Sequence, residues 1–116
     1  MAEELKEQIH NPATRRVDSE ADASLEKEFD ILAKQWREET AHLSVIFRKA
    51  MHPAYQRIIG MGEKAIPLIL REMQERGGYW FWALNAITGE DPAQPSASYK
   101  EAVRTWLNWG KEHGHI

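Results

Sequence analysis

Apolar residues recur along this chain at the three- and four-residue spacing of amphipathic helices. The first stripe begins after Ser24 and consists of Leu25, Phe29, Leu32 and Trp36. The rhythm continues at Leu43, Phe47 and Ala50, but polar Thr40 interrupts it. One long helix over residues 24–51 and two helices that meet near residues 40–43 both fit this pattern. We favour two helices, because a domain of 116 residues has little structure with which to cover so long a helix.

Glycine and proline divide the middle of the chain into shorter segments. Pro53 ends the preceding helix and suits the first turn of a new one, which closes at the turn Gly60-Met61-Gly62. That turn lacks the spacing of a phosphate-binding loop, so we interpret it as a helix–helix turn. The next helix begins near Glu63 and stops at Gly77-Gly78. Its predicted core face is Ile66, Ile69, Leu70 and Met73.

The segment from Tyr79 to Thr88 is apolar on nearly every side. A helix of this kind must be covered all round, so it is either the central element or it leaves an aromatic face for a partner. After a loop at residues 90–97, Ser98 and Glu101 have the spacing of a capping box that opens a last helix. The pattern therefore predicts an all-α fold, a compact bundle of five to six helices.

Charge is concentrated at the N-terminus. Residues 1–22 hold three cations and six anions, a net charge of −3 that equals the −3 of the whole chain, so residues 23–116 balance at 12 against 12. Because residues 1–22 also lack periodicity, we predict a mobile acidic arm there and a single α-helical domain at residues 23–116. A neutral body lacks the broad positive field that attracts phosphate backbones, so nucleic acid is the weaker hypothesis.

Composition further narrows the class of protein to which this chain can belong. The sequence contains no run of about 18 apolar residues, so no membrane span is predicted. The N-terminus has no apolar signal-peptide core. The absence of Cys excludes disulfides and thiolate zinc ligands, and a cytoplasmic protein is the natural interpretation. The five His lack zinc-site spacing, and we expect His113 and His115 only to decorate the terminus. We therefore expect no metal and no cofactor.

The middle of the chain resembles a HEAT-like repeat. The residues that carry the resemblance are a helix ending in IIGMG, a second helix AIPLIL, and WALNAITG, over roughly residues 53–89. In that family a helix, a tight turn and a second helix form one unit, and arrays of units bind partners through one helical surface. This chain holds about one and a half units, whereas solenoids need about three for stability. The first helix and the Trp-rich last helix would then act as caps, or a partner chain would.

A second resemblance covers residues 36–110. The stretch HPAYQRIIGMG…WFWALNAITGEDP is similar to a group of small uncharacterised bacterial proteins that are often carried on mobile or accessory genome segments. This resemblance implies no particular activity. It does suggest a partner encoded by a neighbouring gene, in an antitoxin-like or accessory pairing.

The five Trp residues divide into two groups. Trp36, Trp80 and Trp106 lie on the inward stripes of their helices and are predicted core residues. Trp82 and Trp109 lie on flanks, where Trp is typical of binding hot spots. Polar Asn85, inside the apolar helix, is a predicted acceptor for a buried indole N–H.

We therefore predict a protein–protein interaction module, an adaptor or antitoxin-like accessory protein without enzymatic activity. The predicted contact residues are Tyr55, Arg57, Trp82, Asn85, Glu90 and Trp109, with aromatic anchors and a polar rim. Self-association is another way to cover the aromatic surface.

Three alternatives remain open. Glu90 and Asp91 are paired carboxylates that could support acid–base chemistry, although a loop role fits them better. Salt-sensitive nucleic-acid binding would use Arg48, Arg57 or Arg71. A HEAT-like enzyme that excises alkylated bases is disfavoured, because those arrays are longer and basic.

Overall fold

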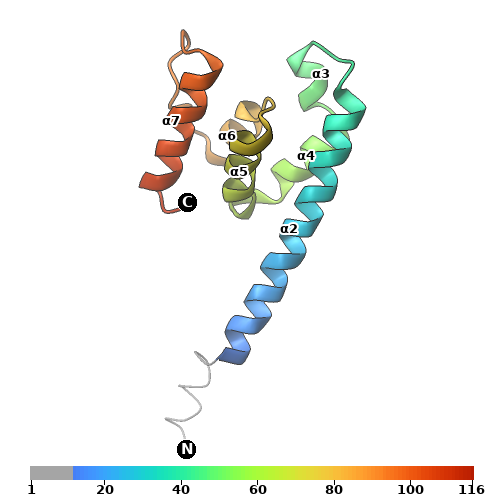
Figure 1. The fold of residues 1–116 in the computed structure, drawn as a ribbon, viewed down its shortest axis with the longest axis vertical. Coiled ribbons are helices and arrows are strands. Elements are labelled where there is room, and N and C mark those ends of the chain that lie inside the picture. The colour runs from blue at the N-terminus through green and yellow to red at the C-terminus, as the bar shows by residue number, and fades with distance from the viewer. Residues whose placement is uncertain (1–11) are drawn as a thin grey trace, which may run out of the picture.

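The computed structural model describes the backbone of residues 12–116 and the side chains from residue 20 onward, and every regular element in this part is helical (Figure 1). The elements are α2 (Pro12–Thr40), α3 (Ile46–Ala50), α4 (Pro53–Gly60), the 3-10 helix η1 (Gly62–Ala65), α5 (Ile66–Arg76), α6 (Phe81–Thr88) and α7 (Tyr99–Glu112). The predicted all-α bundle of five to six helices is confirmed. No described helix is apolar enough over a sufficient length to cross a bilayer.

The first helix differs from the prediction at its start. The predicted break near residues 40–43 is confirmed, since α2 ends at Thr40 and α3 begins at Ile46. Residues 12–22, which we predicted to belong to a mobile acidic arm at residues 1–22, form the first turns of α2, while residues 1–11 of that arm lie outside the described part. The reason is local: Pro12 suits a first helical position, and no glycine or proline follows it before Thr40.

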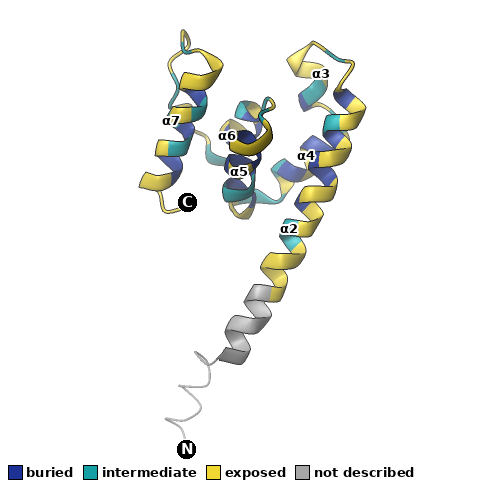
Figure 2. Ribbon diagram, in the orientation of Figure 1, coloured by how far each residue is buried: buried dark blue, intermediate teal, exposed yellow. Residues whose placement is uncertain are grey.

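The core is centred on Trp80, immediately before α6. Its side chain is fully buried and touches rings from two other helices. Trp36 of α2 lies 4.6 Å from it, between ring centroids, and Tyr55 of α4 stacks on it at 5.2 Å with an interplanar angle of 9°. As predicted, Trp36, Trp80 and Trp106 are core residues. Burial follows the inner faces of the helices, as the dark blue segments of α2, α4 and α7 show (Figure 2).

The hydroxyl of Tyr55 connects α4 to the start of α6. It donates to the carbonyl oxygen of Tyr79 at 3.0 Å and accepts from the backbone N–H of Ala83 at 2.9 Å. The N-cap residue of α6 is Trp80, which supplies no side-chain cap. Tyr55 therefore satisfies one of the free N–H groups that every helix exposes at its first turn. Burial raises the pKa of Tyr55, so this hydroxyl keeps its proton.

Gly78 makes the approach of α6 to the core possible. Its φ of 97° is one that side-chain-bearing residues rarely adopt. A Cβ at this position would also lie 3.1 Å from Nε1 of Trp80 and 3.5 Å from the ring of Trp36. The turn after α5 thus requires glycine both for its backbone and for the space that the two indoles occupy.

The last helix begins with the predicted capping box. The Ser98 hydroxyl accepts from the Glu101 N–H at 3.2 Å, and the Glu101 carboxylate accepts from the Ser98 N–H at 3.1 Å. The helix then packs closely on α5, since a Cβ on Gly110 would lie 2.6 Å from Cδ1 of Leu70. The cap and this contact fix α7 against the opposite side of α5 from α2 (Figure 1).

Replacing Tyr55 with Phe tests the connection between α4 and α6. The variant keeps the stack on Trp80 but leaves the buried Ala83 N–H without its acceptor, so we expect a loss of about 1–3 kcal/mol in the free energy of unfolding. Urea denaturation followed by circular dichroism measures it. The matched control is Tyr99→Phe, whose hydroxyl donates to Gly78 O at 2.8 Å from a side chain that is 43% exposed. In Tyr99→Phe water can replace the lost hydrogen bond to Gly78, so we expect a smaller loss in the free energy of unfolding. Equal losses in the two variants would contradict the bridging role of Tyr55.

The capping box predicts a pH dependence. Hydrogen bonds from the backbone and side chain of Ser98 lower the pKa of Glu101 below its ordinary value of 4.5. The stability that ionised Glu101 adds is therefore present above that ordinary value and lost as pH falls through the lowered pKa. In Ser98→Ala we expect the pKa of Glu101 to rise toward 4.5 in an NMR titration. An unchanged pKa in the variant would show that the Ser98 hydroxyl does not contribute and that the backbone N–H alone lowers the pKa of Glu101.

Candidate functional site

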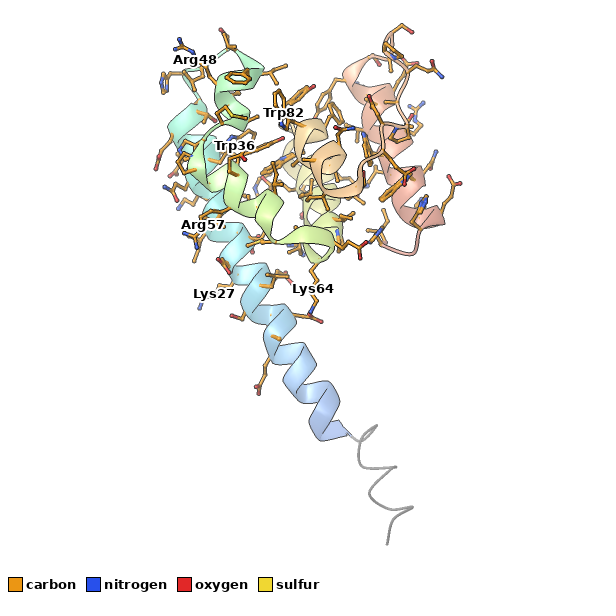
Figure 3. All side chains as sticks on the ribbon, turned by 180° about the vertical axis from the view of Figure 1, so that it is seen from behind. Lys27, Trp36, Arg48, Arg57, Lys64 and Trp82 are labelled. Carbon is orange, nitrogen blue, oxygen red and sulfur yellow. The ribbon has the colours of Figure 1, made fainter. Side chains whose placement is uncertain are left out.

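An exposed group of apolar side chains joins α3 to α6. It consists of Val45, Ile46, Phe47, Met51 and Trp82, here called the apolar patch, whose members are 53%, 40%, 57%, 41% and 36% exposed. The rings of Phe47 and Trp82 meet edge to face at 5.9 Å, so the two helices contribute to one surface. Figure 3 shows Trp82 next to α3, with Arg48 on the outer side of that helix. Exposed apolar side chains that meet across two helices, as Phe47 and Trp82 do, are typical of binding surfaces.

The patch faces outward because the other side of α3 is tied to the core. The indole N–H of Trp36 donates to the carbonyl oxygen of Lys49 at 2.8 Å, and Ala50 is 1% exposed. Further along, His52 caps α4 by accepting from the Ala54 N–H at 3.0 Å, while its Nε2 lies 2.9 Å from a Glu39 carboxylate oxygen. These contacts fix the C-terminal end of the α3 segment against α2 and α4, while its apolar residues remain exposed.

A hollow of ≈ 340 Å³ lies beside Trp82 and is here called the aromatic hollow. Its lining residues are Tyr79, Phe81, Trp82, Asn85 and Asp91. The rings of Tyr79 and Phe81 meet edge to face at 5.2 Å and 81°. A neighbouring hollow, of ≈ 320 Å³, shares Tyr79, Phe81 and Asp91 and extends toward Tyr99 and Trp106. The two hollows therefore meet at the single carboxylate of Asp91.

Asn85 holds the loop that carries Asp91. Its side-chain amide donates to the carbonyl oxygen of Glu90 at 2.9 Å, and the Glu90 N–H donates to the Thr88 hydroxyl at 3.0 Å. The predicted pairing of Asn85 with a buried indole is wrong, because the buried Nε1 atoms of Trp80 and Trp109 have no acceptor in the described part. The Asn85 side-chain amide stabilises the loop at Glu90 instead.

The structure separates the six predicted contact residues. Trp82 and Asn85 both line the aromatic hollow, and Glu90 is exposed beside it. Arg57 lies on α4, where its guanidinium is 3.5 Å from the Glu28 carboxylate of α2. Tyr55 is fully buried, and it acts as the bridge to α6. It therefore offers no surface to a partner.

Trp109 is also buried, at 8% exposure, so the surface predicted there is wrong. Its ring stacks on His113 at 4.3 Å and on His115 at 5.3 Å, which cover it from the chain's own terminus. The two His therefore do more than decorate the C-terminus. A signal was present in the sequence, since His113 follows Trp109 by one helical turn and could pack against it.

Phe47 is the main contact candidate that the sequence pattern missed. It was placed on the core stripe, yet it is 57% exposed. The turn between α2 and α3 resets the helical phase, so counting through Thr40 assigns Phe47 to the wrong face. Polar Thr40 on the apolar stripe is the sequence signal for this reset, because the helical phase starts anew after such a break.

A second, polar cleft lies between α2 and α5. It is lined by Asp30, Lys34, Arg37, Arg71, Glu72, Glu75 and Arg76. Glu72 is 3% exposed, and both Arg37 and Arg76 pair with its carboxylate. Arg71 pairs with Glu26 at 3.0 Å. Its three arginines all pair with carboxylates of α2 or α5, which indicates a structural role in attaching α5 to α2.

No protein-family model matches the chain, and no curated protein or solved structure is significantly similar to it. Among the described residues, no group of three or more His, Asp or Glu is arranged to hold a metal ion. The apolar patch and the aromatic hollow are the candidate functional surfaces of the described part.

The effect of losing an arginine should differ between Arg37, which lines the polar cleft, and Arg57, which lies outside it. In Arg37→Met the buried Glu72 carboxylate loses one of its two partners, and we expect a loss of about 2 kcal/mol, below the ~3–5 kcal/mol of a fully broken buried pair because Arg76 remains. Arg57→Met breaks an exposed pair of the kind that contributes roughly 0–1 kcal/mol. Denaturant unfolding of both variants checks the difference. Equal losses would mean that Glu72 does not depend on Arg37.

Proposed function

We propose that this protein is a cytoplasmic protein–protein interaction module without enzymatic activity, and that it binds its partner through the apolar patch. The observation that carries the proposal is the contact of Phe47 with Trp82, which joins exposed apolar side chains of α3 and α6 into one surface. Truncating large aromatic residues at the centre of an interface typically costs the most binding energy. Trp82 was a predicted anchor, and it retains that role in the proposal.

The rim of the patch supports a partner of defined charge. Arg48 is exposed and Lys49 half-buried, and neither forms an ion pair with another described residue. Charge complementarity fixes register and suppresses wrong partners more than it adds affinity. We therefore propose a partner surface with an apolar ridge flanked by carboxylates. An amphipathic helix with acidic residues beside its apolar face has this chemistry.

The resemblance to HEAT-like repeats supports the same function. Helix α4, η1 and α5 form a helix, a tight turn and a second helix, the arrangement that such a unit requires. In line with the resemblance to bacterial accessory proteins, we propose that the partner is the product of a neighbouring gene.

The charges of the described part favour this proposal over nucleic-acid binding. Of the three arginines that nucleic-acid binding would use, Arg57 pairs with Glu28, and Arg71 pairs with Glu26 and Asp30. Only Arg48 of the three lies outside the ion pairs of the described residues. Residues 23–116 are also neutral overall, so they lack the broad positive field on which non-specific phosphate binding depends.

Capture from the bacterial host tests the proposal. We expect the wild-type chain to retain a specific protein, and Phe47→Ser to lose it, because removing a central aromatic anchor costs about 2 kcal/mol or more, a loss of roughly 30-fold in affinity. Quantitative mass spectrometry of the captured material gives the ratio. Surface plasmon resonance with the purified partner then gives the affinity.

Ile31→Ser is the matched control. Ile31 is 61% exposed on α2 and does not belong to the patch, so its loss removes as much exposed apolar surface without touching the proposed site. Equal loss of the partner in both variants would contradict the proposal. Capture of DNA or RNA that salt removes would also contradict it, as would a stable homodimer in light scattering that Phe47→Ser dissociates.

A further inference from the structure

The aromatic hollow has a chemistry that the apolar patch lacks. Three aromatic side chains, Tyr79, Phe81 and Trp82, line it together with one carboxylate and one amide. No Lys, Arg or His belongs to its lining or to that of the neighbouring hollow. Aromatic walls with a carboxylate and without a cation attract positive charge, because ring faces carry negative electrostatic potential.

We propose that the aromatic hollow is a binding site for an organic cation, a substituted ammonium or guanidinium group. Trp82, the aromatic residue that interacts best with cations, forms one wall. Asp91 supplies the counter-charge at the junction of the two hollows. The inference goes beyond the proposed protein partner, since it concerns a hollow that shares only Trp82 with the apolar patch and a ligand class that can be tested without that partner.

The carboxylate of Asp91 is available for this role. It is exposed, and it forms no ion pair with another described residue, whereas Glu26, Glu28 and Glu72 are each paired with an arginine. The hydrogen bond from Asn85 to Glu90 O fixes the backbone of the loop one residue before Asp91. The carboxylate is thus held near the rings by backbone geometry and is free of an internal cation.

The ring arrangement is fixed before any ligand arrives. Phe81 and Trp82 come just after Trp80, whose ring stacks on Tyr55, and the Tyr55 hydroxyl bonds the backbone of Tyr79 and Ala83 on either side of them. The Trp82 ring also meets Phe47 edge to face. Tyr79 and Phe81 pack edge to face, and Phe81 in turn lies 5.5 Å from the Tyr99 ring. A site whose walls are already positioned spends little binding energy on ordering its own side chains.

Apolar ligands are the alternative that the carboxylate argues against. An uncharged apolar group would fill the same volume, but it would take water from Asp91 without replacing it. Desolvating a carboxylate without compensation costs free energy. A cation of the same shape removes that cost, so shape and charge can be separated by a pair of isosteric ligands.

NMR titration of the purified full-length chain tests the site. The probes are choline, n-butylguanidinium and the uncharged choline isostere 3,3-dimethylbutan-1-ol, each against sodium chloride at matched ionic strength. We expect choline or n-butylguanidinium to shift the Trp82 indole N–H resonance saturably, and the neutral isostere to bind at least about fivefold more weakly. The two cations distinguish an ammonium site from a guanidinium site.

Asp91→Asn and Glu90→Gln form the matched pair of variants. Both remove one negative charge from adjacent positions of the same loop, but only Asp91 lines the hollow. We expect Asp91→Asn to weaken cation binding about fivefold or more and Glu90→Gln to change it less than twofold. Unchanged indole resonances of the core residues Trp36, Trp80 and Trp106 establish that each variant is folded.

Three results would overturn the inference. The first is equal affinity for the neutral isostere, which would make the hollow merely apolar. The second is equal weakening by Glu90→Gln and Asp91→Asn, which would make the effect one of general surface charge. The third is the absence of any saturable shift at Trp82 with either cation. Each outcome leaves the apolar patch untested, so this inference and the proposed partner binding can fail separately.

Discussion

The contact of Tyr55 with Trp80 and the first turn of α6 is the interaction on which the rest of the structure depends. Trp80 is the residue where α2, α4 and α6 meet, and Tyr55 both stacks on its ring and bonds the backbone on either side of it. Helix α6 is short and has no cap of its own, and isolated helices of this length are unstable in water. Tertiary contact with α4 is therefore what makes it a helix.

This anchoring also determines which aromatic residues face the solvent. Successive residues of a helix point in directions about 100° apart, so burying Trp80 and, one turn later, Ala83 and Leu84 turns Trp82 and part of Phe81 outward. The aromatic run at residues 79–82 thus serves two purposes. One ring completes the core, and its neighbours form the apolar patch and the aromatic hollow. Both candidate surfaces follow from one buried side chain.

Periodicity predicted most of the fold, and its failures have specific causes. The helix breaks, the core Trp residues and the capping box at Ser98 all depend on local spacing, which the sequence displays directly. Trp109 was misjudged because its cover comes from the chain's terminus, through His113 and His115. Tyr55 was misjudged because its hydroxyl bonds residues 24 and 28 positions away. Such contacts depend on tertiary structure, and no spacing rule encodes them.

The surface around Trp82 is polarised, and this is the feature that links the two candidate sites. Trp82 belongs to both the apolar patch and the aromatic hollow, with Arg48 and Lys49 on the α3 side and Asp91 on the loop side. A partner that covers Trp82 meets cations in one direction and a carboxylate in the other. Reversing such a partner would place like charges together, which costs free energy. The apolar groups would then supply affinity, and the flanking charges of opposite sign would determine orientation.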